Sequence, residues 1–443
     1  MRTKIQHITL MPGVKMGDPH LKFTEDAVLL IEDSHIVYAG PAAQAIPFEA
    51  DETIEGRGRV ALPGLCNMHT HTPMMLMRSL GSDLALDRWL NEMVFPTEKH
   101  LTDDAVKAAT ELGILEMLRF GTTSFNDMYM RMDMEAEAVR DSGMRALLCY
   151  GVIDFDETCR DLQPGLDLIE KWQGAADGRV RIAIGPHSEA TLTDKMLRKI
   201  KEAAVAYKVP LHMHVNETKK DFDGCIARHG MTAPQYLDSL GLLDEPFLAA
   251  HCVWMTDEDI DLFARKQVTI LHNPVSNLKL ASGVAPIARM LERGCRVTLG
   301  TDGVASNNNL NLWQEMFLMP LLQKGTLLDP TVVSPAQVFA AATSEAAKAL
   351  QHEEDLGYLK PGYLADLILV DVDKCHMWPQ HDLESNLLYA GQGSDVSLTM
   401  VAGKVLYQDG VYTTLDEKAV IARATREAEA LLERAQRAKA AKQ

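Results

Sequence analysis

Apolar runs of strand length alternate with helical patterns through the middle of the chain. Strands that are buried on both faces read as continuous apolar runs, and strands that alternate with helices form parallel sheets. The pattern predicts an α/β fold with eight β/α units, a (β/α)8 TIM barrel. The eight runs cover residues 60–71, 122–129, 145–154, 180–188, 209–218, 247–253, 268–274 and 296–303.

An open, doubly wound sheet is the alternative arrangement of such units. That fold would carry a glycine-rich phosphate-binding turn after an early strand. The sequence contains neither a G-x-G-x-x-G motif nor a P-loop. The closed barrel is therefore favoured.

Short strand patterns appear at both ends of the chain. Neither end has enough of them for a core of its own, so we expect both ends to build one small β-sandwich domain. The expected division is a first β segment at 1–62, the barrel at 63–355, and a second β segment at 356–443. The last segment closes with a solvated amphipathic helix over 416–443.

Composition and charge fit a globular protein and narrow its partners. Of 443 residues, 47% are hydrophobic, and 44 basic against 62 acidic side chains give a net charge of −18. An acidic surface is a poor match for nucleic acid. No apolar run reaches the length of a membrane span or forms a signal peptide. The seven cysteines are scattered and contain no Cys-x-x-Cys, so we expect a reduced, cytoplasmic protein, which we also expect to form a homo-oligomer, a dimer or tetramer.

Side chains that bind metals or titrate mark the ends of six predicted strands. The carboxyl ends of barrel strands converge on one face, and that face hosts catalysis in this fold. Residues far apart in the sequence are therefore predicted to be neighbours. They are His69, His71, His187, His212, His214, Glu217, His251, His272 and Asp302.

The His-x-His pattern indicates a metal site. His69 and His71 point to one side of their strand because side chains alternate with a period of two. Two such nitrogens with a further histidine and a carboxylate suit zinc. A lone strand-end histidine is usually a hydrogen-bonded core residue, but the joint occurrence favours metal binding. His212 and His272 are exceptions, and His212 lies deeper than His214, where a structural role is as reasonable as a functional one.

Several of these segments resemble the motifs of the amidohydrolase superfamily. They are LPGLCNMHTH at 62–71, HVNET at 214–218, AHC at 250–252 and LGTDG at 299–303, and the resemblance spans nearly the whole chain. Within the superfamily, the chain resembles the methylthioadenosine/S-adenosylhomocysteine deaminases, a branch of the ATZ/TRZ-type hydrolases. Residues 89–98, 185–188 and 302–308 carry this closer likeness.

The resemblance implies one divalent metal ion per chain. Two-metal members of the superfamily carry a bridging lysine at the end of strand four, where this sequence has Gly185-Pro186-His187. Zinc is the expected metal, with iron or manganese as alternatives. By analogy and by spacing, its ligands are His69, His71, His214 and Asp302.

The activity implied is that of a hydrolase acting on the carbon–nitrogen bond of a cyclic amidine. It would deaminate an adenine nucleoside such as 5′-methylthioadenosine, S-adenosylhomocysteine or adenosine and release ammonia with an inosine-type product. Glu217 would shuttle protons and contact the ring, although a glutamate here is ordinarily a surface-loop residue. His251 would hydrogen-bond the attacking water, and Asp302 would accept a proton from that water as well as bind the metal.

Substrate recognition is implied for Glu98 and His187. A carboxylate can accept hydrogen bonds from both hydroxyls of a ribose, although Glu98 could instead be a charge at a helix start. Relatives that take the homocysteine-bearing substrate place arginines near the end of strand three. Here Tyr150 stands in the first position and only Arg160 is a candidate for the second.

Two other functions stay open at this point. The chain could deaminate another aminated ring, such as a guanine-type purine or an aminotriazine, although Glu98 favours a ribose. It could also be an inactive metal-binding barrel that serves in assembly, which the complete ligand set and Glu217 argue against.

Overall fold

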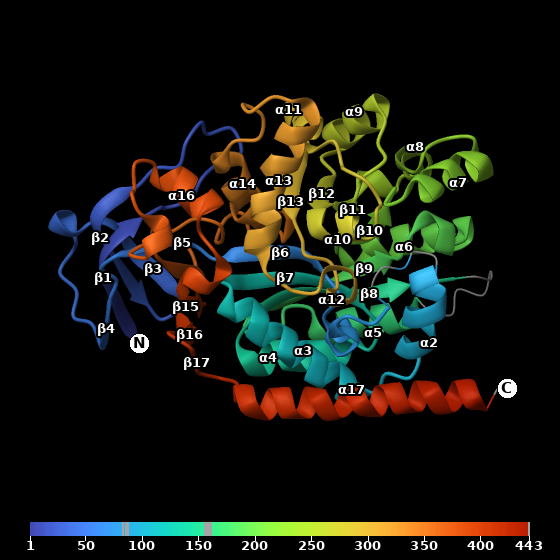
Figure 1. Ribbon diagram of the computed structural model, residues 1–443, viewed down its shortest axis with the longest axis horizontal. Helices are drawn as coiled ribbons and strands as arrows, with labels where there is room; N and C mark the ends of the chain where they lie inside the picture. Colours follow the sequence, from blue (N-terminus) through green and yellow to red (C-terminus); the bar gives the residue numbers. More distant parts are fainter. Residues whose placement is uncertain (82–83, 85–87, 155–161, 442–443) are drawn as a thin grey trace.

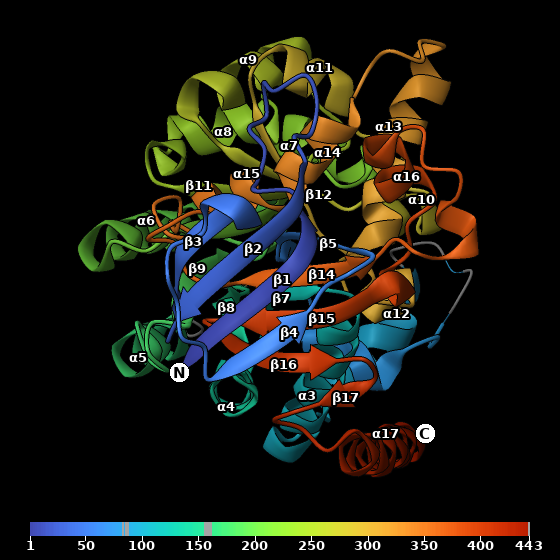
Figure 2. The ribbon, with the colours of Figure 1, turned by 90° about the vertical axis from the view of Figure 1, so that its left-hand side faces the viewer.

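A computed structural model describes residues 1–81, 84, 88–154 and 162–441. It shows two bodies (Figure 1). One is a barrel with its surrounding helices, and the other is a smaller sheet on one flank, built from strands near both ends of the chain. Turning the molecule by 90° brings this smaller sheet to the front (Figure 2).

Eight parallel strands form the barrel and are neighbours in chain order. Every residue of the first, second, sixth and seventh of these strands is buried, because helices cover the outside and side chains fill the inside. The predicted TIM barrel is confirmed. The strands are β6 (Leu65–Thr70), β7 (Thr122–Tyr129), β8 (Arg145–Val152), β9 (Val180–Pro186), β10 (Leu211–Val215), β11 (Phe247–His251), β12 (Thr269–His272) and β13 (Arg296–Leu299).

The first and last strands approach each other closely. The backbone N–H of Asp302 donates to the carbonyl of His69 (2.8 Å), and Asn67 exchanges two hydrogen bonds with Thr301 (2.8 and 3.0 Å). A Cβ atom on Gly300 would lie 2.7 Å from both the backbone nitrogen and the Cβ of His69. Glycine at this position therefore allows β13 to reach β6.

Helices follow the strands and surround the barrel. Threonine side chains cap several of them: Thr102 accepts from the N–H of Ala105, and Thr218 and Thr256 form capping boxes. The helices are α3 (Asp103–Arg119), α4 (Met132–Ser142), α5 (Gln163–Trp172), α6 (Asp194–Tyr207), α7 (Lys219–His229), α8 (Ala233–Ser239), α9 (Asp257–Lys266), α10 (Pro274–Lys279), α11 (Ile287–Glu292), α12 (Val304–Asn307), α13 (Leu312–Leu327), α14 (Pro335–Ala342) and α15 (Ser344–Ala349).

The smaller sheet has nine strands and combines both chain ends, as predicted. β5 pairs with β1 on one side and with β14 on the other, so the two halves of the expected sandwich are continuous with each other. Arg145 of the barrel and Asp366 form a buried ion pair (3.0 Å) that joins the two bodies. The strands are β1 (Arg2–Leu10), β2 (Thr24–Glu32), β3 (His35–Pro41), β4 (Glu52–Glu55), β5 (Arg59–Pro63), β14 (Leu367–Asp371), β15 (Val396–Val401), β16 (Lys404–Gln408) and β17 (Val411–Tyr412).

The last helix, α17 (Glu417–Ala440), lies along α3 of the barrel (Figure 1). The sequence predicted a solvated helix, but Val420, Ala424 and Leu431 are buried on one face. Apolar residues three, four or seven positions apart share a helix face, so this face docks while the rest meets solvent. Among the described residues, no helix is both long and apolar enough to cross a membrane.

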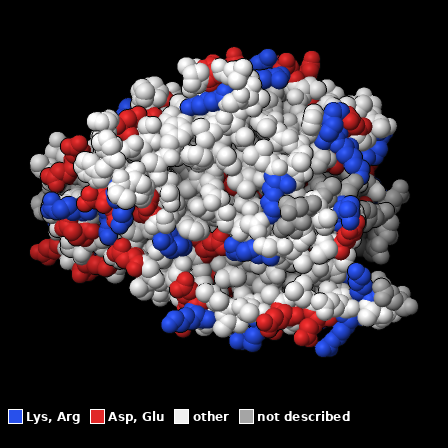
Figure 3. Space-filling view, in the orientation of Figure 1, with Lys and Arg blue, Asp and Glu red and all other residues white. Residues whose placement is uncertain are grey.

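Charged side chains on the face shown in Figure 3 lie mainly around the periphery, with both signs close together. The centre of that face is largely uncharged. Helix α13 exposes three large apolar side chains, Phe317, Leu321 and Leu327, and the exposed Leu328 follows directly after its end.

The close approach at Gly300 yields a stability prediction. Gly300→Ala should lower the free energy of unfolding by about 1–3 kcal/mol, the usual cost of overpacking a well-packed site. Gly325→Ala is the matched control, because Gly325 lies in α13 with no heavy atom within 4 Å of the added Cβ. The control should be stabilising by about 0.5–1 kcal/mol. Urea denaturation measures both, and a Gly300→Ala protein as stable as the control variant would contradict this account of barrel closure.

Candidate active site

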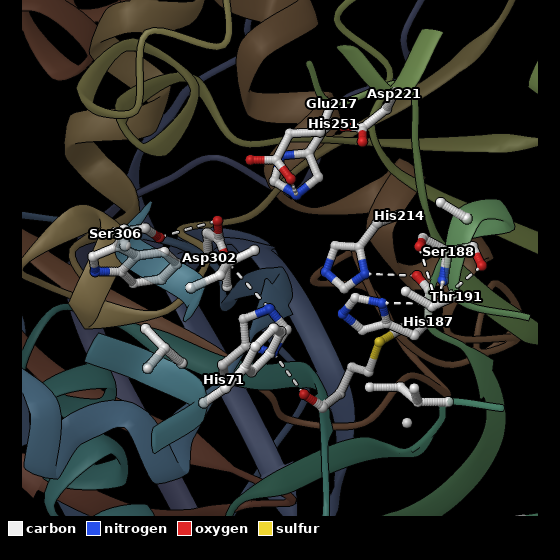
Figure 4. Close-up of a pocket in the computed structure, with 18 of the residues that line it drawn as sticks. His71, His187, Ser188, Thr191, His214, Glu217, Asp221, His251, Asp302 and Ser306 are labelled. Carbon is white, nitrogen blue, oxygen red and sulfur yellow. Dashed lines mark hydrogen bonds and ion pairs between the residues drawn. The ribbon is translucent and has the colours of Figure 1, made fainter. Parts of the chain in front are cut away.

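A cavity of about 370 Å³ opens at the carboxyl ends of the barrel strands. Its wall includes the predicted residues His71, His187, His214, Glu217, His251, Asp302 and Glu98. Figure 4 shows the side chains of His71, His187, His214, His251, Glu217 and Asp302 around one shared space. The barrel therefore brings together residues from the ends of five different strands and from the segment that carries Glu98.

The four predicted metal ligands converge at the base of this cavity. His69 ends β6 with Thr70 and His71, His214 lies on β10, and Asp302 follows β13. Nitrogen atoms of the three histidines lie within 4.8 Å of one another. Asp302 Oδ1 lies 3.2 Å from His71 Nε2 and 3.6 Å from His69 Nε2. Three imidazoles and one carboxylate form a donor set that suits a zinc ion.

Contacts behind the three histidines leave one nitrogen of each ring facing the centre. The Nδ1–H of His71 donates to the Met128 carbonyl (2.6 Å), and that of His214 donates to the His187 carbonyl (2.8 Å). His69 Nδ1 lies 2.9 Å from His212 Nε2, while His69 Nε2 is buried without a partner. This arrangement, with the second nitrogen engaged and Nε2 available, is typical of metal-binding histidines.

Asp302 is fixed on its other side. Its Oδ2 accepts hydrogen bonds from Ser276 (2.6 Å) and Ser306 (3.1 Å), and its Oδ1 accepts from the N–H of Gly303 (2.8 Å). Burial acts to raise the pKa of Asp302, but the hydrogen bond from His71 and the neighbouring histidines lower it well below the usual value. The carboxylate is therefore ionised and attracts positive charge to this point.

The histidines respond to burial and to that carboxylate. Burial lowers the pKa of His69 and of His214 well below the usual range. Burial also acts to lower the pKa of His71, but Asp302 and Asp127 raise it to about 9. His69 and His214 are thus neutral at physiological pH, which is the form that binds a metal.

Glu217 and His251 lie beside the cluster, where the sequence placed them. Glu217 follows β10, and its Oε2 lies 3.8 Å from His251 Nε2. Burial raises the pKa of Glu217. The side chain lines the cavity, so Glu217 is not a surface-loop residue.

The backbone bends sharply where these side chains enter the cavity. Asn216, His251 and Asp302 have φ values of 49°, 71° and 61°. This left-handed region costs a non-glycine residue roughly 1–3 kcal/mol and is concentrated at functional sites.

The outer wall contains the residues predicted to meet the substrate. Glu98 ends the short helix α2 (Phe95–Glu98), and burial raises its pKa. Burial lowers the pKa of His187 to about 4, so this ring is neutral. The π-helical turn η3 (Trp89–Val94) adds apolar lining.

The structure describes only one of the two residues that were considered near the end of strand three, Tyr150 and Arg160. Gly151 and Ile153 are among the described residues that line the cavity, whereas Tyr150 is not. Arg160 lies outside the described residues. Lys and Arg side chains are absent from the described lining.

Several supporting residues were missed in the sequence. Ser276 and Asn277 lie on α10, directly after β12, and contact Asp302 and His251. Their signal was the presence of three polar residues, Asn273, Ser276 and Asn277, within five positions of the end of a buried strand. His272 is buried at the end of β12, and both of its ring nitrogens lack partners. It does not line the cavity.

Comparison with known proteins places these features in a family context. The model of the amidohydrolase family matches residues 60–406. A protein named 5-methylthioadenosine/S-adenosylhomocysteine deaminase from Moorella thermoacetica is 44% identical over 402 residues, 90% of this chain and 94% of its own. A 5′-deoxyadenosine deaminase from Methanothermobacter thermautotrophicus is 43% identical over 89% and 92%. The crystal structure of an adenosine deaminase from Xanthomonas campestris with bound zinc superimposes with a TM-score of 0.92 at 31% identity, over 97% of this chain and 98% of that one.

The contact behind His69 yields a prediction about metal affinity. His212→Leu removes the acceptor for His69 Nδ1–H, and loss of such a supporting contact typically costs 10–100-fold in metal affinity or activity. His212→Gln can keep an acceptor and should lose less. Competition with a chelator measures zinc affinity in both folded variants. Equal affinities for His212→Leu and the wild type would show that His212 only fills space.

Proposed function

Since the chain belongs to the amidohydrolase family and is a hydrolytic deaminase of adenine nucleosides, we propose that it uses one divalent metal ion and acts on nucleosides with a small, apolar 5′ group. The observation that carries this proposal is a carboxyl group with a raised pKa, Glu217, beside a cluster of three histidines and Asp302 in one cavity. That is the combination a water-activating deaminase requires.

The proposed metal is zinc, held by His69, His71, His214 and Asp302. When bound, such an ion lowers the pKa of a coordinated water from about 16 toward about 7, so that hydroxide is available at neutral pH. The donor set and the buried His69 Nε2, which has no hydrogen-bond partner, support this assignment. A single ion is proposed because β9 ends in Gly185-Pro186 and is followed by His187 instead of a lysine.

Proton transfer falls to the protein's own side chains. Glu217 takes a proton from the attacking water and delivers it to the ring nitrogen as the new carbon–oxygen bond forms. The hydroxyl of the tetrahedral adduct then releases the second proton of the water, and this proton is transferred to the exocyclic amine, so that the ring carbon becomes a carbonyl, the carbon–nitrogen bond breaks and ammonia leaves. Burial raises the pKa of Glu217, which suits a group that must both accept and return a proton. His251 hydrogen-bonds the water, and Asp302 is the further acceptor for its proton.

Substrate recognition is proposed for the outer wall. Glu98 would accept from the ribose hydroxyls and His187 would contact the nucleoside. Beyond them, Trp89, Val94 and Phe95 give the cavity an apolar wall. The described part of this lining contains no Lys or Arg, which supports a methylthio or deoxy 5′ group over a homocysteine carboxylate, while the candidate cation Arg160 lies outside the described residues.

The site belongs to the barrel domain, which we place at residues 63–355, between the two parts of the small domain at 1–62 and 356–443. We further propose a homo-oligomer, a dimer or tetramer, that covers the exposed apolar side chains Phe317, Leu321 and Leu327 of α13 and the adjacent Leu328. Light scattering on the purified protein would contradict this if it gave the mass of one chain.

A substrate panel tests the function directly. The zinc-loaded protein is assayed for ammonia release and for the change in adenine absorbance. The panel comprises 5′-methylthioadenosine, 5′-deoxyadenosine, adenosine, S-adenosylhomocysteine, adenine, guanine and an aminotriazine. The first two should have the highest kcat/KM. Preference for a bare ring would overturn the nucleoside assignment, and preference for S-adenosylhomocysteine would overturn the apolar 5′ site.

Glu217→Gln separates proton transfer from metal binding. Glutamine is nearly isosteric but cannot take up and return a proton, so kcat should fall by about 10²–10⁴-fold. Metal content should stay near one ion per chain and KM within about tenfold, which elemental analysis and steady-state kinetics measure. A variant that keeps its metal and more than about a tenth of wild-type turnover would place the shuttle elsewhere.

Glu98→Gln tests the ribose contact. A hydrogen bond to a charged group is worth about 1.5–3 kcal/mol, or one to two orders of magnitude in specificity. The substitution should therefore reduce kcat/KM for ribosides far more than for the matching 2′-deoxynucleosides. Equal losses on the two substrate series would remove Glu98 from the sugar site.

A further inference from the structure

Two consecutive residues of α10 reach the reaction centre from behind. This short helix follows β12, and Ser276 and Asn277 are almost completely buried. Ser276 donates to Asp302 (2.6 Å), and Asn277 Oδ1 lies 2.9 Å from His251 Nδ1. The same helical turn thus contacts a proposed metal ligand and the histidine beside the attacking water.

The contact with Asn277 fixes the position of a proton on His251. With the Asn277 amide in the orientation that places its oxygen toward the ring, the contact at 2.9 Å puts the proton on His251 Nδ1, because an amide oxygen only accepts hydrogen bonds. A neutral imidazole then has an unprotonated Nε2 that accepts hydrogen bonds. That Nε2 lies 3.8 Å from Glu217 Oε2, on the cavity side of the ring.

A second asparagine makes the opposite demand. Asn273 Nδ2 lies 3.4 Å from the same Nδ1, and an amide N–H could donate only to an unprotonated nitrogen. The contact with Asn277 has the usual length of an N–H···O hydrogen bond, whereas 3.4 Å exceeds the normal range. The geometry therefore favours Asn277 as the residue that decides the tautomer.

We propose that Asn277 is a positioning residue that holds His251 as its Nδ1–H tautomer, so that Nε2 presents a lone pair to the attacking water. The role of that water rests on the proposed function. His251 then accepts a hydrogen bond from the water, and Glu217 is the group that carries protons to the substrate. The two side chains therefore have different roles, because the Nε2 atom of His251 accepts a hydrogen bond from the water whereas Glu217 transfers protons.

The turn is rigid enough to impose this geometry. The N–H of Val275 donates to the buried carboxyl of Glu315 (3.0 Å), and the N–H of Asn277 donates to the Asn273 carbonyl (3.0 Å). With the bond from Ser276 to Asp302, α10 is held on both sides. Side chains held by packing and by further hydrogen bonds keep a reactive geometry that loose ones lose.

The tautomer itself is measured by NMR on the zinc-loaded protein labelled with ¹⁵N-histidine at neutral pH. The His251 signals are assigned as those missing from His251→Gln. The proposal expects a protonated Nδ1 and an unprotonated Nε2. A protonated Nε2 would overturn it. This readout does not depend on turnover, so a protein that failed the substrate panel would reject the proposed function without deciding the tautomer.

Variants separate positioning from a merely structural role. Asn277→Leu removes the acceptor at similar volume and should lower kcat by about 10–100-fold, the usual loss for a supporting residue of this kind. Metal content should be kept and KM should change less than about threefold. Asn277→Asp keeps an oxygen acceptor, so its kcat should be at least threefold higher than that of Asn277→Leu. Wild-type kcat in Asn277→Leu would overturn the proposal.

Asn273→Ala is the matched control from the same turn. It removes the longer contact with His251 and should leave the Nδ1–H tautomer in place. A tautomer that changes in Asn273→Ala would overturn the proposal. If Asn277→Leu does not fold, the wild-type spectrum and that of the control still decide between the two asparagines.

Discussion

The whole site depends on the closure of the barrel between β6 and β13. The hydrogen bond from the Asp302 N–H to the His69 carbonyl joins the first barrel strand to the segment that follows the last one. It also brings His69 and Asp302, two of the proposed metal ligands, next to each other. Gly300 makes the approach sterically feasible. Parallel strands contribute their carboxyl ends to one face, so once this seam is closed, His214 and His251 arrive at the same place without further constraint.

Closure alone would leave the side chains free to rotate, and the fold prevents this with a second contact for each. His69 is held by His212, His71 by the Met128 carbonyl, and His214 by the His187 carbonyl. The strained backbone at His251 and Asp302 aims those side chains inward. Strain of this size persists only where the surrounding structure compensates for it, and the dense hydrogen bonding around α10 provides that compensation.

The division between what the sequence predicted and what it missed follows the range of the interactions. Strand periodicity and the chemistry of His69, His71, His214 and Asp302 are local properties, so the barrel and its cluster could be predicted. The contacts of His212 and Asn277 depend on which atoms face each other across strands, and no pattern along the chain specifies that. The same reason explains the docked face of α17, whose partner α3 is about three hundred residues earlier in the sequence.

The environments of the titratable groups in the cavity follow from two opposing effects, burial and neighbouring charges. Burial lowers the pKa of His187 to about 4 and raises those of Glu98 and Glu217. Each of these shifts has the direction that burial imposes, because loss of solvent destabilises the charged form of a carboxyl group or an imidazole. Negative charge is instead concentrated on Asp302, where the histidines and three hydrogen bonds stabilise it. Asp302 thus combines two proposed roles, as a ligand of the cation and as a proton acceptor, and its charge also acts to raise the pKa of Glu217.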